Sequence, residues 1–234
     1  MHSIGKGASI PGSQEYRIST FQSAESSTNH GAKIARYLLV KRAADIIIAG
    51  VLLVSLFPLF AIIAALIYAY DRKAIFYWQL RVGQDGRLFR FYKFRSMVVN
   101  ADAIKASLLS RNEATGPIFK MKDDPRITPV GRILRRYSLD ELPQLVSVFI
   151  GDMSLVGPRP HLPSEIAACP HYPMERLSVP PGLICLREVR GRSLMSFDRW
   201  LDSDLEYIRT RSTSTDFSIL LRVFRAVVQA EGAY

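Results

Sequence analysis

Two adjacent acids, Asp140 and Glu141, have the residue types and surroundings that phosphate chemistry needs. They lie in the segment Ser138-Leu-Asp-Glu-Leu-Pro-Gln144. Three basic residues stand just upstream: Arg132, Arg135 and Arg136. One carboxylate can attack a phosphorus atom, and a pair of carboxylates can hold Mg²⁺ against a diphosphate. We therefore predict that Asp140 and Glu141 are catalytic residues and ligands of Mg²⁺.

The same spacing has a purely structural explanation. Ser138 and Glu141 stand three residues apart, as in a capping box, so the acids could serve only to start a helix. Pro143 weakens this explanation, because with Ser138 as the cap it would occupy the fifth helical position, where proline breaks a backbone hydrogen bond. Spacing alone leaves the catalytic and the capping interpretation open.

Other basic side chains are placed to bind an anion. Lys93 and Arg95 alternate in the strand-like run Lys93-Phe-Arg-Ser-Met97, so both can point toward one anionic ligand. Arg159 stands between two prolines in Gly157-Pro-Arg-Pro160. The prolines fix the backbone and limit the entropy that is lost when the guanidinium binds a phosphate. A solvated strand face and a plain surface turn are the alternatives.

The longest apolar stretch runs from Ile46 to Tyr70, 25 residues without a charge. This exceeds the roughly 20 residues that a membrane helix needs. Pro58 falls at the midpoint, where a proline kinks or breaks a helix. Each half would reach only about 18 Å, which is short of the ~30 Å hydrocarbon core of a bilayer. Neither half is therefore expected to span a membrane alone.

Basic residues flank this stretch on both sides. Those that precede it are Lys33, Arg36, Lys41 and Arg42, and those that follow it are Arg72, Lys73, Arg81, Arg87 and Arg90. Positive residues mark the cytoplasmic side of a membrane. We therefore favour a re-entrant hairpin that enters the membrane, bends at Pro58 and returns to the same face. A proline-kinked single span is the alternative.

The charge of the chain points to anionic partners. The formal net charge is +10 at pH 7, and 15 Lys or Arg stand against 6 Asp or Glu between Asp71 and Arg136. This juxtamembrane excess favours membrane lipids and phosphorylated substrates. No zinc-finger spacing, heptad-plus-basic region or RNA-binding aromatic run accompanies it, so we expect no nucleic-acid partner. Cys169 and Cys185 lie far apart, with no CxxC or Cys/His spacing, so they suggest neither a disulfide framework nor a zinc site. We expect both to be ordinary reduced thiols in a cytosolic setting.

The rest of the chain predicts an α+β fold that is mainly helical. Asp85-Gly86 separates two aromatic runs, 76–83 and 88–94, and is typical of a β-hairpin turn. Further along we expect a weak helix over 101–111, a loop over 116–131 and a helix over 142–149 that Gly151 stops. Residues 217–228 carry an apolar stripe, so this helix lies either in the membrane interface or on the core.

These elements indicate three parts of the chain. Residues 1–32 are expected to form a flexible N-terminal tail, because they are rich in Ser, Gly and Thr and lack apolar periodicity. Residues 33–72 form the re-entrant membrane helix-break-helix. Residues 73–234 form a cytosolic catalytic domain with a small β-hairpin and amphipathic interfacial helices.

In this combination the chain resembles the bacterial sugar transferases of the monotopic phosphoglycosyl transferase family. Three long motifs carry the resemblance: Lys93-Phe-Arg-Ser-Met97, Arg135-Arg-Tyr-Ser-Leu-Asp-Glu-Leu-Pro-Gln144 and Gly151-Asp-Met-Ser-Leu-Val-Gly-Pro-Arg-Pro160. Shorter matches are Arg81-Val-Gly83, Asp85-Gly86 and Lys41-Arg42. The resemblance covers about Lys41 to Phe224.

The resemblance implies a two-step exchange. Asp140 would attack the β-phosphate of a UDP-sugar, release UMP and hold the phosphosugar as an acyl phosphate, which polyprenyl phosphate then accepts. Glu141 matches the partner acid that helps to hold Mg²⁺, and Arg159 matches an arginine that binds the substrate phosphate. Further candidates for binding the anionic substrates are Lys93, Arg95 and Arg135.

The resemblance also implies a place and a pathway class. We expect the enzyme on the cytoplasmic face of a bacterial inner membrane, where it would initiate a surface glycan such as an exopolysaccharide, an O-antigen or a glycoconjugate. A homodimer is one possible oligomeric state.

Two segments depart from the family's pattern. The family usually has Pro-Gly-Ile-Thr-Gly-Trp followed by Ala-Gln-Val-Asn-Gly-Arg, where this chain has Pro181-Gly-Leu-Ile-Cys-Leu186 and Arg187-Glu-Val-Arg-Gly-Arg192. Phe57 precedes the membrane proline, where the family usually has Ser or another polar residue. A non-catalytic membrane adaptor that binds anionic lipids is therefore the alternative function.

Overall fold

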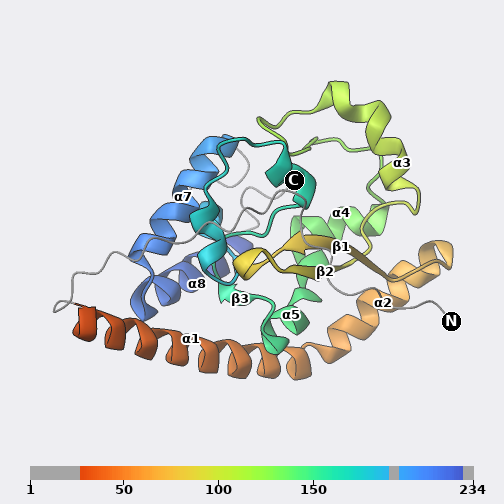
Figure 1. Ribbon diagram of the computed structural model, residues 1–234. Coiled ribbons are helices and arrows are strands. Elements are labelled where there is room, and N and C mark those ends of the chain that lie inside the picture. Colours follow the sequence, from red (N-terminus) through yellow and green to blue (C-terminus); the bar gives the residue numbers. More distant parts are fainter. Residues whose placement is uncertain (1–26, 190–194, 229–234) are drawn as a thin grey trace, which may run out of the picture. The chain divides into compact units, whose positions relative to one another are not determined.

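The apolar stretch forms two helices that meet at a bend. The computed structural model describes residues 27–189 and 195–228, with α1 at Ser27–Ser55 and α2 at Phe57–Asp71 (Figure 1). Leu56 separates the two helices, and Pro58 lies in the first turn of α2, where a missing N–H costs no helical hydrogen bond. The helix break predicted at Pro58 is present. The start of α1 at Ser27 falls within the stretch that the sequence assigns to the tail.

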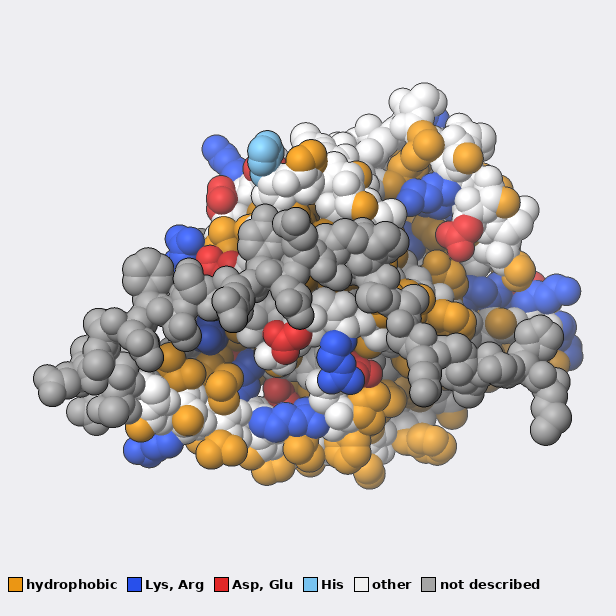
Figure 2. Space-filling model, in the orientation of Figure 1, with side chains coloured by type: hydrophobic (Ala, Val, Ile, Leu, Met, Phe, Trp, Pro, Cys, Tyr) orange, Lys and Arg blue, Asp and Glu red, His pale blue; other side chains and the backbone are white. Residues whose placement is uncertain are grey.

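The bent pair has the length and composition of a membrane segment. Among the described residues, no single helix is long and apolar enough to cross a bilayer. The segments Gly31–Ser55 and Phe57–Asp71 have the required length and apolar composition when taken together, and the bend between them is 59°. Within 46–70, six large apolar side chains are more than half exposed: Ile47, Val51, Val54, Phe57, Ile62 and Leu66. Figure 2 shows hydrophobic side chains gathered along the edge that these helices form. Such exposure suits a helix in hydrocarbon.

An antiparallel hairpin follows the helix pair. β1 spans Phe76–Val82 and β2 spans Leu88–Phe94, and the short helix η1 at Gln84–Gly86 joins them. Asp85 and Gly86 both have positive φ, which a tight turn between twisted strands requires. The predicted hairpin and its turn are confirmed.

Residues 101–136 pass from a weak helix through a loop to a capped helix. α3 spans Ala101–Lys105 and η2 continues it over Ala106–Arg111, as predicted. The loop predicted over 116–131 is wrong at its end, because α4 spans Pro129–Arg136. Thr128 caps α4 by accepting a hydrogen bond from the Gly131 N–H, and proline in a first turn favours a helix start.

The remaining elements are short until the last two helices. They are η3 (Leu139–Glu141), α5 (Gln144–Ile150), β3 (Ser154–Val156), α6 (Pro163–Ala167), η4 (Met174–Ser178), β4 (Gly182–Ile184), η5 (Leu186–Val189), α7 (Phe197–Thr210) and α8 (Thr213–Val228). α5 ends at Gly151, whose positive φ suits a helix C-terminus, as predicted. β3 and β4 pair in parallel, which was not predicted because three-residue strands carry too little periodicity.

Two of the three apolar clusters among the described residues surround the segment that carries the acids. The largest joins β2, α5 and α8 through buried residues that include Phe91, Leu145 and Ile219. A second packs α2 against Phe94 of β2 and Leu134 of α4. Figure 1 shows the hairpin between these helices, with α5 beside it. The segment between α4 and α5 is therefore anchored at both ends, and the fold is α+β and mainly helical.

α8 packs one face on the core. Ile219 and Val223 are buried there, and Leu220 packs against the same cluster. Phe217 and Leu221, which belong to the predicted apolar stripe, are exposed. Core packing thus accounts for one side of the helix, and placement in the membrane interface stays an expectation for the other. The side chains of residues 224–228 lie outside the described part.

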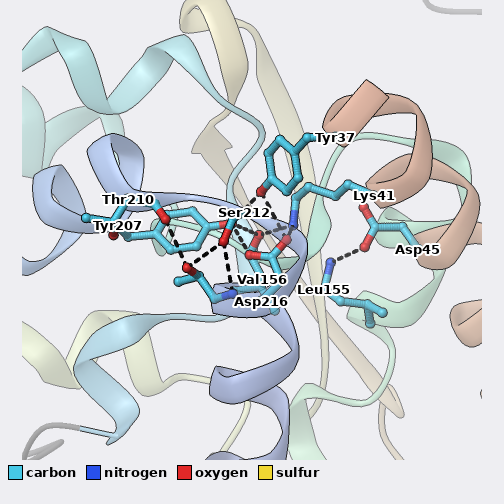
Figure 3. A network of polar contacts seen from close by, with 10 residues as sticks. Tyr37, Lys41, Asp45, Leu155, Val156, Tyr207, Thr210, Ser212 and Asp216 are labelled. Atoms are coloured by element: carbon cyan, nitrogen blue, oxygen red, sulfur yellow. Dashed lines mark hydrogen bonds and ion pairs between the residues drawn. The ribbon is translucent and has the colours of Figure 1, made fainter. Parts of the chain in front are cut away.

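A buried polar network around Asp216 ties α1 to the C-terminal helices (Figure 3). Lys41 Nζ lies 2.8 Å from Asp216 Oδ2 and also donates to the Val156 carbonyl at 2.8 Å. The hydroxyl of Tyr37 donates to Oδ2 at 3.0 Å, and that of Tyr207 donates to Oδ1 at 2.8 Å. Three donors thus satisfy one buried carboxylate, which offsets the free-energy cost of removing it from water.

Arg42 and Asp45 extend this docking to α5 and β3. Arg42 donates to the carbonyls of Val148 at 2.7 Å and Phe149 at 2.8 Å, at the C-terminus of α5. The Leu155 N–H donates to Asp45 at 3.0 Å. Arg42, like Lys41, therefore binds protein groups, so fewer flanking charges are available to lipid headgroups than the sequence suggested.

Gly131 supplies a test of the packing of α4. A Cβ at this position would come within 1.9 Å of the Ser96 carbonyl oxygen, whereas a Cβ at Gly31 would meet nothing within 4 Å. Gly131→Ala should lower the free energy of unfolding by about 1–3 kcal/mol or more, through overpacking. Gly31→Ala should be neutral or stabilise by up to ~1 kcal/mol, because alanine favours helices. Thermal unfolding in detergent micelles measures both, and equal losses in the two variants would contradict the close approach.

Candidate active site

Asp140 and Glu141 occupy a single helical turn between two helices. This turn, η3, follows Ser138, whose φ of 56° and ψ of 22° place it in the left-handed region. Asp140 is 4% exposed, and the Glu141 side chain is mostly buried, at 18% exposed. The turn is short and both neighbouring helices are packed, so the two carboxylates have little freedom to separate.

The capping-box interpretation of these acids is wrong. Ser138 makes no side-chain hydrogen bond at the start of η3, and α5 begins later, at Gln144 after Pro143. Glu141 bonds to Ser138 through its backbone: the Glu141 N–H donates to the Ser138 carbonyl oxygen at 3.2 Å. The Glu141 carboxylate is instead engaged by basic side chains.

Glu141 binds two cations that come from other elements. Lys93 Nζ, on β2, lies 2.7 Å from Glu141 Oε1. Arg159 donates to Glu141 through both Nη atoms, one of them at 3.0 Å from Oε2. Lys93 also lies 3.6 Å from Asp140 Oδ2. Four of the residues predicted from separate motifs thus meet in one cluster, which we call the acid-pair cluster: Lys93, Asp140, Glu141 and Arg159.

The charges in this cluster keep Glu141 ionised. Burial by itself raises the pKa of a carboxyl group, but Arg159 and Lys93 outweigh that effect and hold the pKa of Glu141 well below its ordinary value. Because the carboxylate is paired with two cations, removal of any one member would leave a buried charge without its partner.

Arg95 and Arg135 lie outside the acid-pair cluster. Arg95 makes two hydrogen bonds of 2.6 Å to Asp71, at the end of α2. Arg135 Nε donates to Ser96 Oγ at 2.9 Å. Arg95 therefore ties the hairpin to α2. Both arginines line the same pocket as Lys93, and their role in binding an anionic substrate stays a prediction.

A basic pocket of about 560 Å³ opens beside the acid-pair cluster. Lys93 lines this pocket and also contacts Asp140 and Glu141, so it connects the pocket to the acid-pair cluster. The other basic side chains of the lining are Lys73, Arg81, Arg95, Lys105, Lys120, Arg126 and Arg135. Tyr77 and Phe119 add aromatic surface. A pocket of this volume and charge suits an anionic molecule with an aromatic part.

The acid pair fits a metal ion that the substrate also binds. Among the described residues, no three His, Cys, Asp or Glu side chains gather in a way that could enclose a metal. Mg²⁺ commonly takes one or two carboxylates together with substrate phosphates, and Asp140 and Glu141 supply such oxygen donors. Glu188 lies 3.8 Å from Arg159, which places a third carboxylate beside the acid-pair cluster.

Sequence reasoning missed part of the pocket. Tyr77, Gln79 and Arg81 line it from alternate positions of β1. Tyr77 pairs across the hairpin with Lys93, so these side chains share one face of the sheet with it. Side chains alternate between the two faces of a strand, so every second residue of β1, counted from the one opposite Lys93, was predictable as part of this face.

The segment that departs from the family's pattern also reaches the cluster. Glu188 contacts Arg159, and Arg187 lies over the Trp200 ring at 3.9 Å from its centroid. Residues 190–194 of this segment lie outside the described residues. The departure from the family's pattern therefore places the acidic side chain of Glu188 beside Arg159. No sequence pattern predicted the contact between Glu188 and Arg159.

The fold and the site define a class of protein. It is a mainly helical α+β domain in which a buried acid pair meets basic side chains beside a bent apolar helix pair. The chain belongs to the bacterial sugar transferase family, whose model matches residues 36–230. The matched range includes every predicted site residue.

Several curated proteins are similar to this chain. The galactosyl transferase CpsE of Streptococcus agalactiae serotype III is 41% identical over 94% of this chain and 49% of that protein. The exopolysaccharide production protein ExoY of Sinorhizobium fredii is 36% identical over 83% of this chain and 88% of that protein. The undecaprenyl-phosphate galactose phosphotransferase of Salmonella typhimurium is 38% identical over 88% of this chain and 44% of that protein. The chain spans about half the length of CpsE and of the phosphotransferase.

The low pKa of Glu141 predicts how stability depends on pH. A carboxyl group whose pKa is lowered by folding stabilises the native state above its ordinary pKa of about 4.5, and this contribution is lost as the pH falls below that value. Glu141→Gln should destabilise the protein by about 3 kcal/mol at pH 7, because Lys93 and Arg159 lose the carboxylate that lies nearest to them. The difference between wild type and variant should shrink on acidification. Denaturant unfolding in micelles between pH 3.5 and 7 measures it, and a difference that does not change with pH would contradict the ion pairs.

Proposed function

We propose that this protein transfers a sugar phosphate from a UDP-sugar to polyprenyl phosphate and so begins a surface glycan. The observation that carries the proposal is the acid pair Asp140 and Glu141, contacted by Lys93 and Arg159 beside a basic pocket. The names of two relatives, a galactosyl transferase and an undecaprenyl-phosphate galactose phosphotransferase, support the same reaction class.

The donor binds across the pocket and the acid-pair cluster. Its diphosphate lies at Lys93 and Arg159, because a guanidinium presents paired donors that match phosphate oxygens. Its nucleoside occupies the pocket that Lys93 shares, where Tyr77 and Phe119 offer aromatic surface to the uracil. This placement brings the β-phosphorus to Asp140.

Asp140 is the nucleophile. A carboxylate oxygen of Asp140 attacks the β-phosphorus, the bond from that phosphorus to the bridging oxygen breaks, and UMP leaves with the electron pair. An oxygen of polyprenyl phosphate then attacks the same phosphorus. The bond to Asp140 breaks, which restores the carboxylate and yields a polyprenyl-diphosphate-linked sugar. Lys93 and Arg159 stabilise the charge on the phosphoryl oxygens in both steps.

Asp140 and Glu141 are the residues that would hold Mg²⁺ together with the diphosphate. When bound, the ion neutralises phosphate charge and polarises the reacting phosphoryl group. Glu141 is suited to this role because Arg159 and Lys93 keep its pKa low, so that its carboxylate is ionised at neutral pH.

The pair α1–α2 is a re-entrant hairpin that holds the acid pair at the cytoplasmic face of a bacterial inner membrane. Its bend and its exposed apolar side chains support this, as do Arg72 and Lys73 at its end. Polyprenyl phosphate presents its phosphate at the headgroup plane. Exposed Phe217 and Leu221 on α8 suit the same interface.

UMP release tests the reaction. Wild type in lipid nanodiscs with undecaprenyl phosphate and Mg²⁺ should release UMP from at least one of a panel of UDP-sugars and form a radiolabelled phosphosugar adduct. Asp140→Asn should lose both activities by on the order of 10⁴-fold or more, because an amide cannot act as the nucleophile. Asp202→Asn, on the exposed side of α7, is the matched control and should keep both. A normal adduct in Asp140→Asn would remove that residue as nucleophile, and no UMP from any donor would favour the non-catalytic adaptor.

Cysteine labelling tests the topology. Single cysteines at positions 10 and 107, in a variant whose Cys169 and Cys185 are replaced, should both resist a membrane-impermeant reagent in intact cells, because a hairpin leaves both on the cytoplasmic side. Both should react once the cells are lysed. Labelling of only one of them from outside would establish a single span.

A further inference from the structure

The loop that carries Arg159 is held at four successive carbonyl oxygens. Two of these carbonyls accept from backbone groups: Pro158 from the Gly182 N–H at 2.8 Å, and His161 from the Val82 N–H at 3.0 Å. The other two accept from side chains: Arg159 from Arg176 Nη2 at 2.9 Å, and Pro160 from Arg81 Nη1 at 2.8 Å. Loop carbonyls at a protein surface commonly bind water instead. Two of the four donors here are arginine side chains, which come from β1 and η4.

Arg176 makes the most extensive of these contacts. It is 3% exposed, and its guanidinium also binds Asp204, His161 Nδ1 and the Tyr172 hydroxyl, with Nε at 3.0 Å from Asp204 Oδ2. Burial, aided by Arg176, lowers the pKa of His161 to about 2, so its neutral ring can accept this hydrogen bond. The guanidinium cannot turn away from the Arg159 carbonyl without giving up these partners.

We propose that Arg176, oriented by Asp204, is a positioning residue that aims Arg159 at the phosphate of the substrate. The nature of that phosphate rests on the proposed function, whereas the placement of the loop rests on the contacts of Arg176. Glu141 holds the guanidinium of Arg159 from one side, and Arg176 holds its backbone from the other. A side chain that is fixed in its binding geometry beforehand loses less entropy when the substrate arrives.

Arg176→Lys tests this role. Lysine keeps the positive charge beside Asp204 but has a single ammonium group, so it cannot bind Asp204 and the Arg159 carbonyl with the same geometry. Calorimetry with UDP and Mg²⁺ should show an affinity about 10-fold lower than that of wild type. Asp204→Asn, which leaves Arg176 in place but loosens it, should lower the affinity in the same direction.

Hydrogen exchange gives a second readout that does not depend on the ligand. Amides of the peptide 155–162 should exchange roughly 10-fold faster in Arg176→Lys, because the loop loses a fixed donor. Unchanged exchange in this peptide would overturn the inference. A wild type that binds no UDP would contradict the proposed donor instead, and the exchange result would then still decide whether Arg176 orders the loop.

Two controls separate positioning from a general loss of stability. Arg209→Lys changes an arginine whose ion pair with Glu175 is exposed, and it should alter neither UDP affinity nor loop exchange. Ile219→Val removes one buried methylene from α8 and should lower the Tm without affecting UDP binding. A loss of UDP affinity in Ile219→Val as large as that in Arg176→Lys would overturn the proposal.

A double-mutant cycle identifies the residue through which Arg176 acts. In an Arg159→Lys background, Arg176→Lys should weaken UDP binding by less than about 2-fold more, since its effect passes through Arg159. A full 10-fold loss in that background would mean that Arg176 acts independently of Arg159, and the proposal would fail.

Discussion

The site depends on the buried carboxylate of Glu141. It joins Lys93 on the hairpin to Arg159 on the loop after β3, and both cations reach it from elements that are distant in the sequence. A buried charge that loses one partner costs several kcal/mol, so each cation is held in place by the need to satisfy Glu141. A phosphate that enters this cluster would therefore meet cations that are already positioned.

The apolar helix pair and the acid pair share their supports. Arg42 of α1 binds the carbonyl end of α5, and the acids stand just before the start of that helix. Lys41 donates to the Val156 carbonyl, three residues before Arg159. Through these short connections, the helix pair that we propose to be embedded in the membrane is coupled to the site that meets a lipid phosphate in the proposed reaction.

Local patterns predicted the local elements well. Asp85-Gly86 gave the hairpin turn, Gly151 the end of α5 and Pro58 the break between α1 and α2, because each acts through its own backbone conformation. The prediction of a loop over 116–131 failed at its end. Pro129 was assigned to a loop, although proline is equally at home in a first helical turn.

The sequence by itself determined the candidate chemistry, since the acids, the basic residues and the apolar stretch are visible as residue types and spacings. Only the tertiary structure decided which of them act together. Lys93 and Arg159 reach Glu141, whereas Arg95, two residues from Lys93, reaches Asp71 instead. The tertiary structure also revealed Arg176 and Glu188 beside Arg159. Such contacts join distant parts of the chain, so they depend on how the elements pack, and a periodicity of two or 3.6 residues carries no record of them.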